Sequence, residues 1–154
     1  MSPTPTRVRF APAPSGYLHV GSARSALFNW LFARKVNGTF VLRIEDTNAE
    51  LAKPEFYDAI TEPLKWLGLQ WDEGPFYQSQ RSEKYLEAIN ALLEKGFAYR
   101  CDCSRESIES RNNVDGFKGG YDGYCRNREV PDGPNVSIRF KTPKNQFVKI
   151  RDTI

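Results

Sequence analysis

The sequence lacks any long hydrophobic segment, and this excludes a transmembrane helix among its predicted elements. The first six residues, MSPTPT, contain no apolar stretch and do not resemble a secretory signal. We interpret residues 1–6 as a short disordered leader and expect a cytoplasmic protein with no membrane partner. With 154 residues, of which 40% are hydrophobic and 27% charged, the chain has the composition of a soluble domain with a buried core.

Charge of one sign is not in large excess either. The 22 basic and 19 acidic residues leave a formal net charge of +3. This value is typical of a soluble domain with a mixed surface, and it permits nucleic-acid binding only through local faces.

Cysteine and histidine are scarce, with three cysteines and a single histidine. An odd number of cysteines argues against a closed disulfide framework. All three lie within residues 101–125. In a cytosolic chain such clustering favours metal ligands or a redox site over structural disulfides.

Strand and helix signals alternate in the first part of the chain. Residues 7–12 are typical of a strand that Pro12 terminates, and residues 22–36 have apolar side chains at helical spacing. Residues 39–44 form an apolar run of the kind found in buried parallel strands. Together these segments predict one βαβ unit and an α/β fold.

The later segments predict a mixture of helices, strands and loop. Pro63 interrupts the first of these helices and is expected to kink or divide it. The predicted elements are helices over 54–67, 81–95 and 104–111, strands over 97–99 and 136–140, a loop over 112–135, and a hairpin partner for the last strand over 147–150.

The most informative stretch runs from Pro12 to Ser22, where the first strand joins a helix N-terminus. Doubly wound folds bind nucleotides at this position, because free backbone N–H groups and the helix dipole favour phosphate. Gly21 would allow a base or phosphate to approach the backbone. His19 would donate to a phosphate oxygen as charge develops. The alternative is that His19 is a capping histidine and Gly21 a turn residue.

Several motifs resemble the glutamyl-tRNA synthetase family of class I aminoacyl-tRNA synthetases. The resemblance covers nearly all of residues 7–154 and implies the N-terminal part of a Rossmann-like catalytic domain with a small inserted zinc-binding, acceptor-end segment. It implies catalytic-domain residues over 7–100 and the inserted segment over 101–154. The motifs that carry it are Arg9–Gly16, His19–Arg24, Leu42–Thr47, Trp66–Leu69, Asp72–Pro75 and Tyr77–Arg81.

The resemblance also implies roles for individual residues. Arg9, Ala11 and Ala13 would line the glutamate pocket, with Arg9 pairing a substrate carboxylate, and Glu45 would hold the α-amino group. The ATP site would consist of His19, Gly21 and Ser22, and His19 and Gly21 would be catalytic. Two positions depart from the family, which usually has serine where Ala13 stands and often has aspartate where Asn48 stands. Alternatively, Arg9 and Arg43 are strand-face charges that pair with Glu45 and Asp46.

The cysteine cluster is a candidate zinc site, since Cys101 and Cys103 form a C-x-C pair to which Cys125 adds a third thiol. From the residues alone, the fourth ligand is Tyr121, Asp102, Asp122 or water. The resemblance selects Tyr121, because some family members complete the site with a tyrosine at this spacing. Others place histidine where Asn127 stands here. We expect one structural zinc per chain, which ties residues 112–124 near the tRNA acceptor end. The alternative is three unrelated reduced cysteines.

The family reaction activates glutamate with ATP and transfers it to tRNA, and it implies Mg²⁺. No KMSKS-like loop and no anticodon-reading domain occur before Ile154. We therefore expect this chain to be the N-terminal piece of a longer enzyme and to be inactive by itself. The whole enzyme is expected to be a monomer that uses ATP, L-glutamate and the acceptor end of tRNA. Two alternatives remain: the related enzyme that glutamylates queuosine in tRNA-Asp, and a non-catalytic zinc module that binds RNA.

Overall fold

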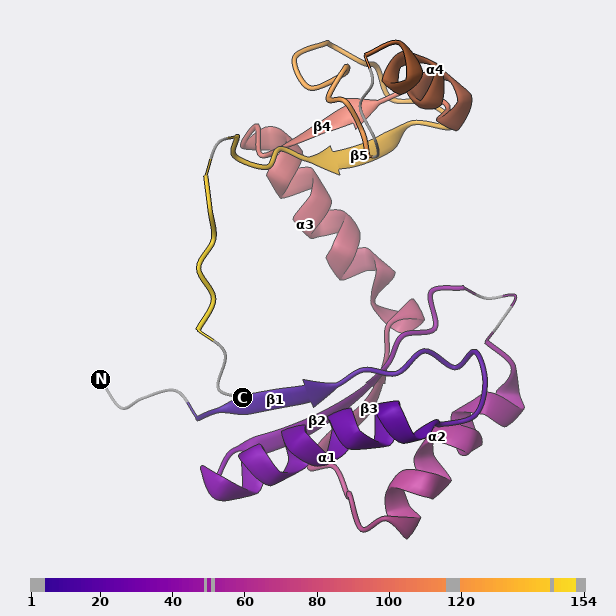
Figure 1. The fold of residues 1–154 in the computed structure, drawn as a ribbon, viewed down its shortest axis with the longest axis vertical. Helices are drawn as coiled ribbons and strands as arrows, with labels where there is room; N and C mark the ends of the chain where they lie inside the picture. The colour runs from indigo at the N-terminus through magenta and orange to yellow at the C-terminus, as the bar shows by residue number, and fades with distance from the viewer. Residues whose placement is uncertain (1–4, 49, 51, 116–119, 145, 152–154) are drawn as a thin grey trace. The chain divides into compact units, whose positions relative to one another are not determined.

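A computed structural model describes residues 5–48, 50, 52–115, 120–144 and 146–151. The contacts within the chain divide it into an N-terminal unit, Met1–Ser82, and a C-terminal unit, Glu83–Ile154. Figure 1 traces the elements of both units. Most of the predicted leader, residues 1–4, lies outside the described residues, whereas the carbonyl of Thr6 accepts a hydrogen bond from the backbone N–H of Thr39.

The N-terminal unit contains a parallel three-stranded sheet in the order β1-β2-β3, which confirms the predicted α/β fold. Helix α1 connects β1 to β2, and α2 lies between β2 and β3 in the sequence (Figure 1). The elements are β1 (Arg7–Phe10), α1 (Val20–Lys35), β2 (Thr39–Ile44), α2 (Pro54–Trp66), β3 (Glu73–Tyr77) and the 3₁₀ turn η1 (Ser79–Arg81).

The core of this unit lies on one face of the sheet. Alternate residues of β1 and β2, namely Phe10, Phe40, Leu42 and Ile44, are buried together with side chains of α1 and α2. Because side chains alternate across a strand, Arg9 and Arg43 belong to the opposite face. The sheet thus separates an apolar side from a side that carries charge.

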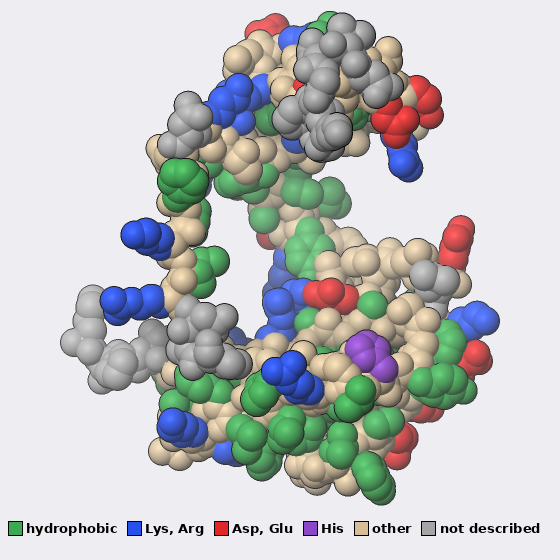
Figure 2. Space-filling view, viewed as in Figure 1, with side chains coloured by type: hydrophobic (Ala, Val, Ile, Leu, Met, Phe, Trp, Pro, Cys, Tyr) green, Lys and Arg blue, Asp and Glu red, His purple; other side chains and the backbone are tan. Residues whose placement is uncertain are grey.

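Helix α1 is apolar on more than its sheet-facing side. Ala26 and Ala33 are fully buried against the core, whereas Leu27, Phe28 and Leu31 are exposed. In Figure 2, hydrophobic side chains gather on the visible surface of the N-terminal unit.

Two elements of this unit differ from the sequence prediction. Strand β3 was not predicted, because Gly74 and Pro75 are disfavoured in strands. Here glycine is required, since a Cβ at Gly74 would lie 2.3 Å from the carbonyl oxygen of Leu42 in the neighbouring strand. Pro63 does not divide α2, which continues to Trp66. It lies in the last turn, where the buried side chain of Leu64 anchors the helix to the core.

The C-terminal unit combines two helices with a two-stranded antiparallel sheet. In this sheet Ala98 lies opposite Phe140 and Cys101 opposite Ser137. The expected pairing of residues 147–150 with the last strand is wrong, because β4 is the partner of β5. Phe147, Val148 and Ile150 are almost fully exposed, so no burial favours a strand there. The elements are α3 (Ser82–Glu94), β4 (Ala98–Cys101), α4 (Arg105–Asp115) and β5 (Ser137–Phe140).

The buried cluster of the C-terminal unit consists of Cys101, Cys125 and Val130, with partly buried Tyr99 and Tyr121 beside it. Helix α3 contributes no buried residue. Within the part of the chain that the structure describes, no helix combines the length and the hydropathy needed to cross a membrane.

Candidate functional site

The loop between β1 and α1 lies at the carboxyl end of the parallel strands, where open α/β sheets bind ligands. The carbonyl of Pro12 accepts a hydrogen bond of 2.9 Å from the backbone N–H of Glu45, the residue that follows β2. A cavity of about 370 Å³ opens beside this loop, and Ala13, His19 and Ser22 line it. Three residues predicted to bind substrates therefore surround one cavity.

His19 is the N-cap of α1 and is exposed at the surface, where Figure 2 shows the single histidine in purple. Its Nδ1 accepts a hydrogen bond of 3.1 Å from the backbone N–H of Gly21. Since Nδ1 is the acceptor, the proton of the neutral ring resides on Nε2. Nε2 lies 3.1 Å from Oγ of Ser22. The N–H of Nε2 is therefore a hydrogen-bond donor located at the helix N-terminus. The capping interpretation and a donor role are thus compatible.

Gly21 makes this arrangement possible. A Cβ at this position would lie 2.9 Å from Cε1 and 3.1 Å from Nδ1 of His19. Any side chain at residue 21 would therefore push the imidazole away from the backbone N–H that it caps. The spacing of His19 and Gly21 reflects a steric requirement of the cap, in addition to any role toward a ligand.

Charged side chains accompany the loop on the sheet face opposite the core. Glu45 forms an ion pair with Arg43, as the alternative interpretation of these charges anticipated. Nε of Arg43 is buried and has no hydrogen-bond partner among the described residues. Arg9 is exposed, and Ala11 is half-buried. The arrangement offers both a carboxylate and guanidinium groups to a ligand that carries charges of both signs.

Asp46 is a residue for which the sequence indicated no role beyond a possible ion pair. It is 8% exposed and is the single buried charged side chain in the described part of the chain. It accepts hydrogen bonds from the backbone N–H of Ser79 (2.9 Å), from Oγ of Ser79 (2.7 Å) and from the hydroxyl of Tyr57 (3.3 Å). Burial raises the pKa of Asp46, but the Ser79 and Tyr57 bonds outweigh it, and the pKa lies below its ordinary value. Asp46 joins the end of β2 to η1 and α2.

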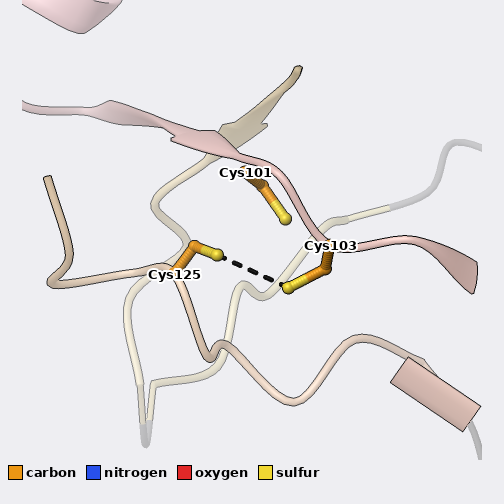
Figure 3. A group of neighbouring side chains, drawn as sticks. All are labelled: Cys101, Cys103 and Cys125. Atoms are coloured by element: carbon orange, nitrogen blue, oxygen red, sulfur yellow. Dashed lines mark hydrogen bonds between the residues drawn. The ribbon is translucent and has the colours of Figure 1, made fainter. Parts of the chain in front are cut away.

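The three cysteines of the C-terminal unit converge, as predicted. Their sulfur atoms all lie within 4.8 Å of one another, and Sγ of Cys103 is 3.5 Å from Sγ of Cys125. Figure 3 shows Cys101 and Cys103 on the strand segment and Cys125 reaching them from the following loop. Thiolates that share one zinc ion at about 2.3 Å are about 3.8 Å apart, so this spacing suits zinc.

Tyr121 also reaches this cluster. Its hydroxyl lies 3.3 Å from Sγ of Cys101 and 4.0 Å from Sγ of Cys103, and it accepts a hydrogen bond of 2.7 Å from the backbone N–H of Cys125. The side chain of Asp102 accepts a hydrogen bond of 3.2 Å from Cys125, and Asp122 is engaged by Arg111. Of the candidate fourth ligands, Tyr121 lies among the thiols, which fits three thiolates and one phenol around zinc.

The environment of the thiols favours ionisation of Cys101. Burial raises the pKa of the Cys101 thiol, but hydrogen bonds from Tyr121 and Arg139 and from the backbone lower it by more. The resulting pKa is about 7, below the ordinary value of a thiol. Burial raises the pKa of Cys125 above its ordinary value. Burial and the neighbouring thiols raise the pKa of Tyr121, so its phenol stays protonated. The phenol can then donate a hydrogen bond to Cys101 once the Cys101 thiol is ionised. A divalent cation would displace these protons on binding.

Comparison with known proteins connects both regions. Residues 5–154 match the sequence family described as tRNA synthetases class I (E and Q), catalytic domain. The chain belongs to this family. The match includes the loop before α1, the end of β2 and the cysteine cluster, so all three lie within one class I synthetase domain.

Curated proteins that are similar to this chain include several glutamate–tRNA ligases. The protein from Geotalea uraniireducens is 50% identical over 98% of this chain and 33% of its own length. The protein from Pelobacter propionicus is 52% identical over 90% of this chain and 30% of its own. The chain thus spans about a third of the length of these class I synthetases.

A solved structure agrees with the sequence comparison. The glutamate tRNA ligase from Elizabethkingia meningosepticum, crystallised in complex with its amino acid, is 32% identical and superposes with a TM-score of 0.76. The superposition covers 91% of this chain and 33% of that protein. The class I synthetase fold predicted from the motifs is confirmed.

Some features of this class I synthetase domain were beyond prediction from the sequence. Asp46 stands next to Glu45 in the motif, but only its contact with Ser79 indicates a structural role. The arginines that surround the cysteines come from three separate segments, and no sequence signal connects them to the thiols. The roles assigned to Arg9, Ala11 and Glu45 toward glutamate remain predictions.

Proposed function

We propose that this chain forms the ATP- and glutamate-binding part of a glutamate–tRNA ligase. The full-length protein attaches glutamate to tRNA through glutamyl-adenylate. The observation that carries the proposal is the cavity at the N-terminus of α1, where His19, Ser22 and Ala13 meet beside the end of β2. The glutamate–tRNA ligase relatives at about half identity support this assignment.

In the first step, an oxygen of the glutamate α-carboxylate attacks the α-phosphorus of ATP, and the bond to the β-phosphate breaks with release of pyrophosphate. Nε2–H of His19 donates to the α-phosphate oxygen on which negative charge develops. Gly21 keeps the imidazole in its capping position, so the donor is oriented before substrate binds. The backbone N–H groups and dipole at the start of α1 assist, and Ser22 completes the ATP site.

Glutamate carries two negative charges and one positive charge, and the proposed pocket matches them. Arg9 pairs a carboxylate, Ala11 and Ala13 form walls, and Glu45 holds the ammonium group. In the structure Glu45 pairs with Arg43. That contact keeps the carboxylate near the sheet edge where the ammonium would bind. In the second step, a hydroxyl of the terminal ribose of tRNA attacks the carbonyl carbon and AMP leaves.

Metal ions complete the proposal. Mg²⁺ would accompany ATP and neutralise its phosphates. Cys101, Cys103, Cys125 and Tyr121 would hold one structural zinc per chain, since their atoms converge in one place. This zinc would order residues 101–125 for contact with the acceptor end of tRNA. We further propose residues 7–100 as catalytic domain, residues 101–154 as the inserted segment, and a monomer that acts in the cytoplasm.

The two other candidate functions have less support. An enzyme specific for queuosine in tRNA-Asp shares the motifs, but the named relatives are glutamate–tRNA ligases. A non-catalytic zinc module does not account for the parallel sheet and the histidine-capped helix of the N-terminal unit.

The test is glutamate-dependent exchange between ATP and pyrophosphate by the full-length protein in the presence of tRNA. We expect exchange with glutamate and little with glutamine or aspartate. Transfer is then measured with tRNA-Glu before and after periodate oxidation of its terminal ribose, and with tRNA-Asp. Loss of acceptance after oxidation supports the proposal. Exchange that does not depend on glutamate overturns it, and acceptance of glutamate by tRNA-Asp but not by tRNA-Glu indicates the queuosine enzyme.

A further inference from the structure

Three arginines lie around the cysteine cluster, and two of them contact a thiol. Nη2 of Arg111 lies 3.4 Å from Sγ of Cys103, and Nη1 of Arg128 lies 3.4 Å from Sγ of Cys125. The guanidinium carbon of Arg139 lies 3.7 Å from the ring centroid of Tyr121, whose hydroxyl is 3.3 Å from Sγ of Cys101. These arginines come from α4, from the loop after Cys125 and from β5, so the fold brings them together from separate segments.

Two of these arginines share one aromatic support. The guanidinium carbons of Arg111 and Arg128 lie 4.4 and 4.7 Å from the ring centroid of Tyr124, the residue before Cys125. Each is also ion-paired, Arg111 with Asp122 at 2.5 Å and Arg128 with Asp102 at 3.4 Å. An aromatic face and a carboxylate therefore restrict each guanidinium. The nitrogen that faces the sulfur, Nη2 of Arg111 or Nη1 of Arg128, also lies within hydrogen-bond distance of the carboxylate.

The charges of this assembly balance around a divalent cation. Zinc binding would ionise the three thiols, which together with the carboxylates of Asp102 and Asp122 would then carry five negative charges, against three positive charges on the arginines. One ion of charge +2 brings the sum to zero. Without the arginines, three thiolates and two carboxylates would surround the ion in a partly buried site, which is costly.

We propose that Arg111 and Arg128, held by Tyr124, are positioning residues of the zinc site. They donate to the thiolates from outside the ligand shell, offset their negative charge and keep Cys103 and Cys125 aimed at the ion. The inference rests on the zinc part of the proposed function and adds residues that the ligand set does not contain. It also assigns Tyr124 a role, although its ring is 53% exposed.

The test is the zinc dissociation constant of the full-length protein, measured by competition with a chromophoric chelator. The thiolate-to-metal absorption of the cobalt-substituted protein serves as a second readout. The variants are Arg111→Gln, Arg128→Gln and Tyr124→Leu. The matched control is Arg105→Gln, because Arg105 lies on the same helix as Arg111 and pairs with Glu109 without touching a thiol.

We expect each of the two arginine variants to weaken zinc binding by about tenfold, in line with other residues that support metal ligands. Tyr124→Leu is expected to weaken it about two- to fivefold, because the arginines remain but lose their support. Arg105→Gln should bind zinc as the unaltered protein does. Arg111→Lys keeps the charge without the guanidinium fork and should fall between the unaltered protein and Arg111→Gln.

Unchanged zinc affinity in both arginine variants overturns the inference and makes these contacts ordinary surface ion pairs. An equal loss in Arg105→Gln does so as well, because the effect would then be general. If Arg111→Gln does not fold, Arg111→Lys and Tyr124→Leu decide the question. Absence of zinc from the unaltered protein instead overturns the zinc proposal itself. This outcome is distinct from a failure of the inference, in which the unaltered protein binds zinc and the variants bind it equally well.

Discussion

Each of the two units of this chain has its own kind of internal contact. The N-terminal unit buries large apolar side chains, including Phe40, Leu42, Ile60 and Leu64, between a parallel sheet and its helices. Among the described residues of the C-terminal unit, the largest fully buried side chains are two cysteines, and arginines, carboxylates and tyrosines surround them. Hydrophobic burial stabilises the first unit, whereas the thiols of the second would gain much of their stability from the zinc that we propose.

The two units would therefore have different functions. In the N-terminal unit a rigid apolar core supports the loop and strand ends that would bind ATP and glutamate. In the C-terminal unit a compact polar cluster would order a surface segment for a nucleic-acid partner. All three tryptophans, Trp30, Trp66 and Trp71, lie in the N-terminal unit. Tryptophan fluorescence therefore reports on that unit alone, and metal content reports on the other.

The largest expected effect is that of zinc removal on the C-terminal unit. A chelator, or Cys125→Ser, should abolish the protection of β4 and β5 against hydrogen exchange, since structural zinc contributes about 10 kcal/mol or more in small domains. Tryptophan fluorescence of the N-terminal unit should not change. Hydrogen-exchange mass spectrometry with metal analysis checks this, and about one zinc per chain is expected before chelation. Equal loss of protection in both units would show that they do not stabilise themselves independently.

The converse experiment breaks the N-terminal unit. Leu64 is fully buried, so Leu64→Ala should lower the free energy of unfolding by about 2–5 kcal/mol. Denaturant titration followed by tryptophan fluorescence measures it. The matched control is Leu86→Ala at an exposed position of α3, which should change little. Zinc content should stay the same in both variants, and loss of zinc in Leu64→Ala would contradict the separation.

His19→Ala tests whether the cap also serves catalysis. We expect adenylate formation by the full-length protein to slow by about 10²–10³, with little change in the KM for ATP, because the donor acts mainly in the transition state. Loss of the cap should also reduce stability by about 0.5–1 kcal/mol. His19→Asn should restore part of the rate. Normal single-turnover adenylation by the Ala variant would leave His19 with the capping role alone.

Glu45→Gln sharpens the assignment of the glutamate pocket. Losing one charge-assisted hydrogen bond costs about 1.5–3 kcal/mol, so the KM for glutamate should rise about 10- to 100-fold while the KM for ATP changes little. Glu73→Gln is the control, because Glu73 also pairs with an arginine on this sheet but has no proposed substrate. An equal rise in both KM values would remove Glu45 from the pocket.

The smallest expected effect concerns pH. Because the pKa of Asp46 is lower in the folded chain than its ordinary 3.8, ionised Asp46 stabilises the fold above that pH, and this contribution is lost as pH falls through the lower folded value. Asp46→Asn should lower the free energy of unfolding by about 1–2 kcal/mol at pH 7. Its stability should then depend less on pH between about 5 and 3. Melting curves across this range check it, and parallel pH profiles of the two proteins would refute it.

The sequence predicted the parts of the molecule in which local pattern and tertiary structure agree. Residues 39–44 are apolar enough to be a buried strand in any arrangement, and β2 has these bounds. The C-x-C pair with a later cysteine predicted the thiol cluster, because chain connectivity already places two of the three sulfurs together. Strand β3 was not predicted, because Gly74 is unfavourable in a strand by its local propensity. Only the close approach of β2, which leaves no room for a Cβ, explains why glycine stands there.

By itself the sequence determined the α/β class, the family, the loop that carries His19 and the convergence of Cys101 and Cys103 with Cys125, because each follows from a pattern of residue types and spacing that can be recognised along the chain. Tertiary structure alone decided that Asp46 is satisfied by Ser79, that β4 pairs with β5, and that Arg111 and Arg128 face the thiols. The physical reason is that no recognisable motif links the partners of these contacts. These contacts join segments whose local patterns are equally compatible with other partners, and only packing selects one.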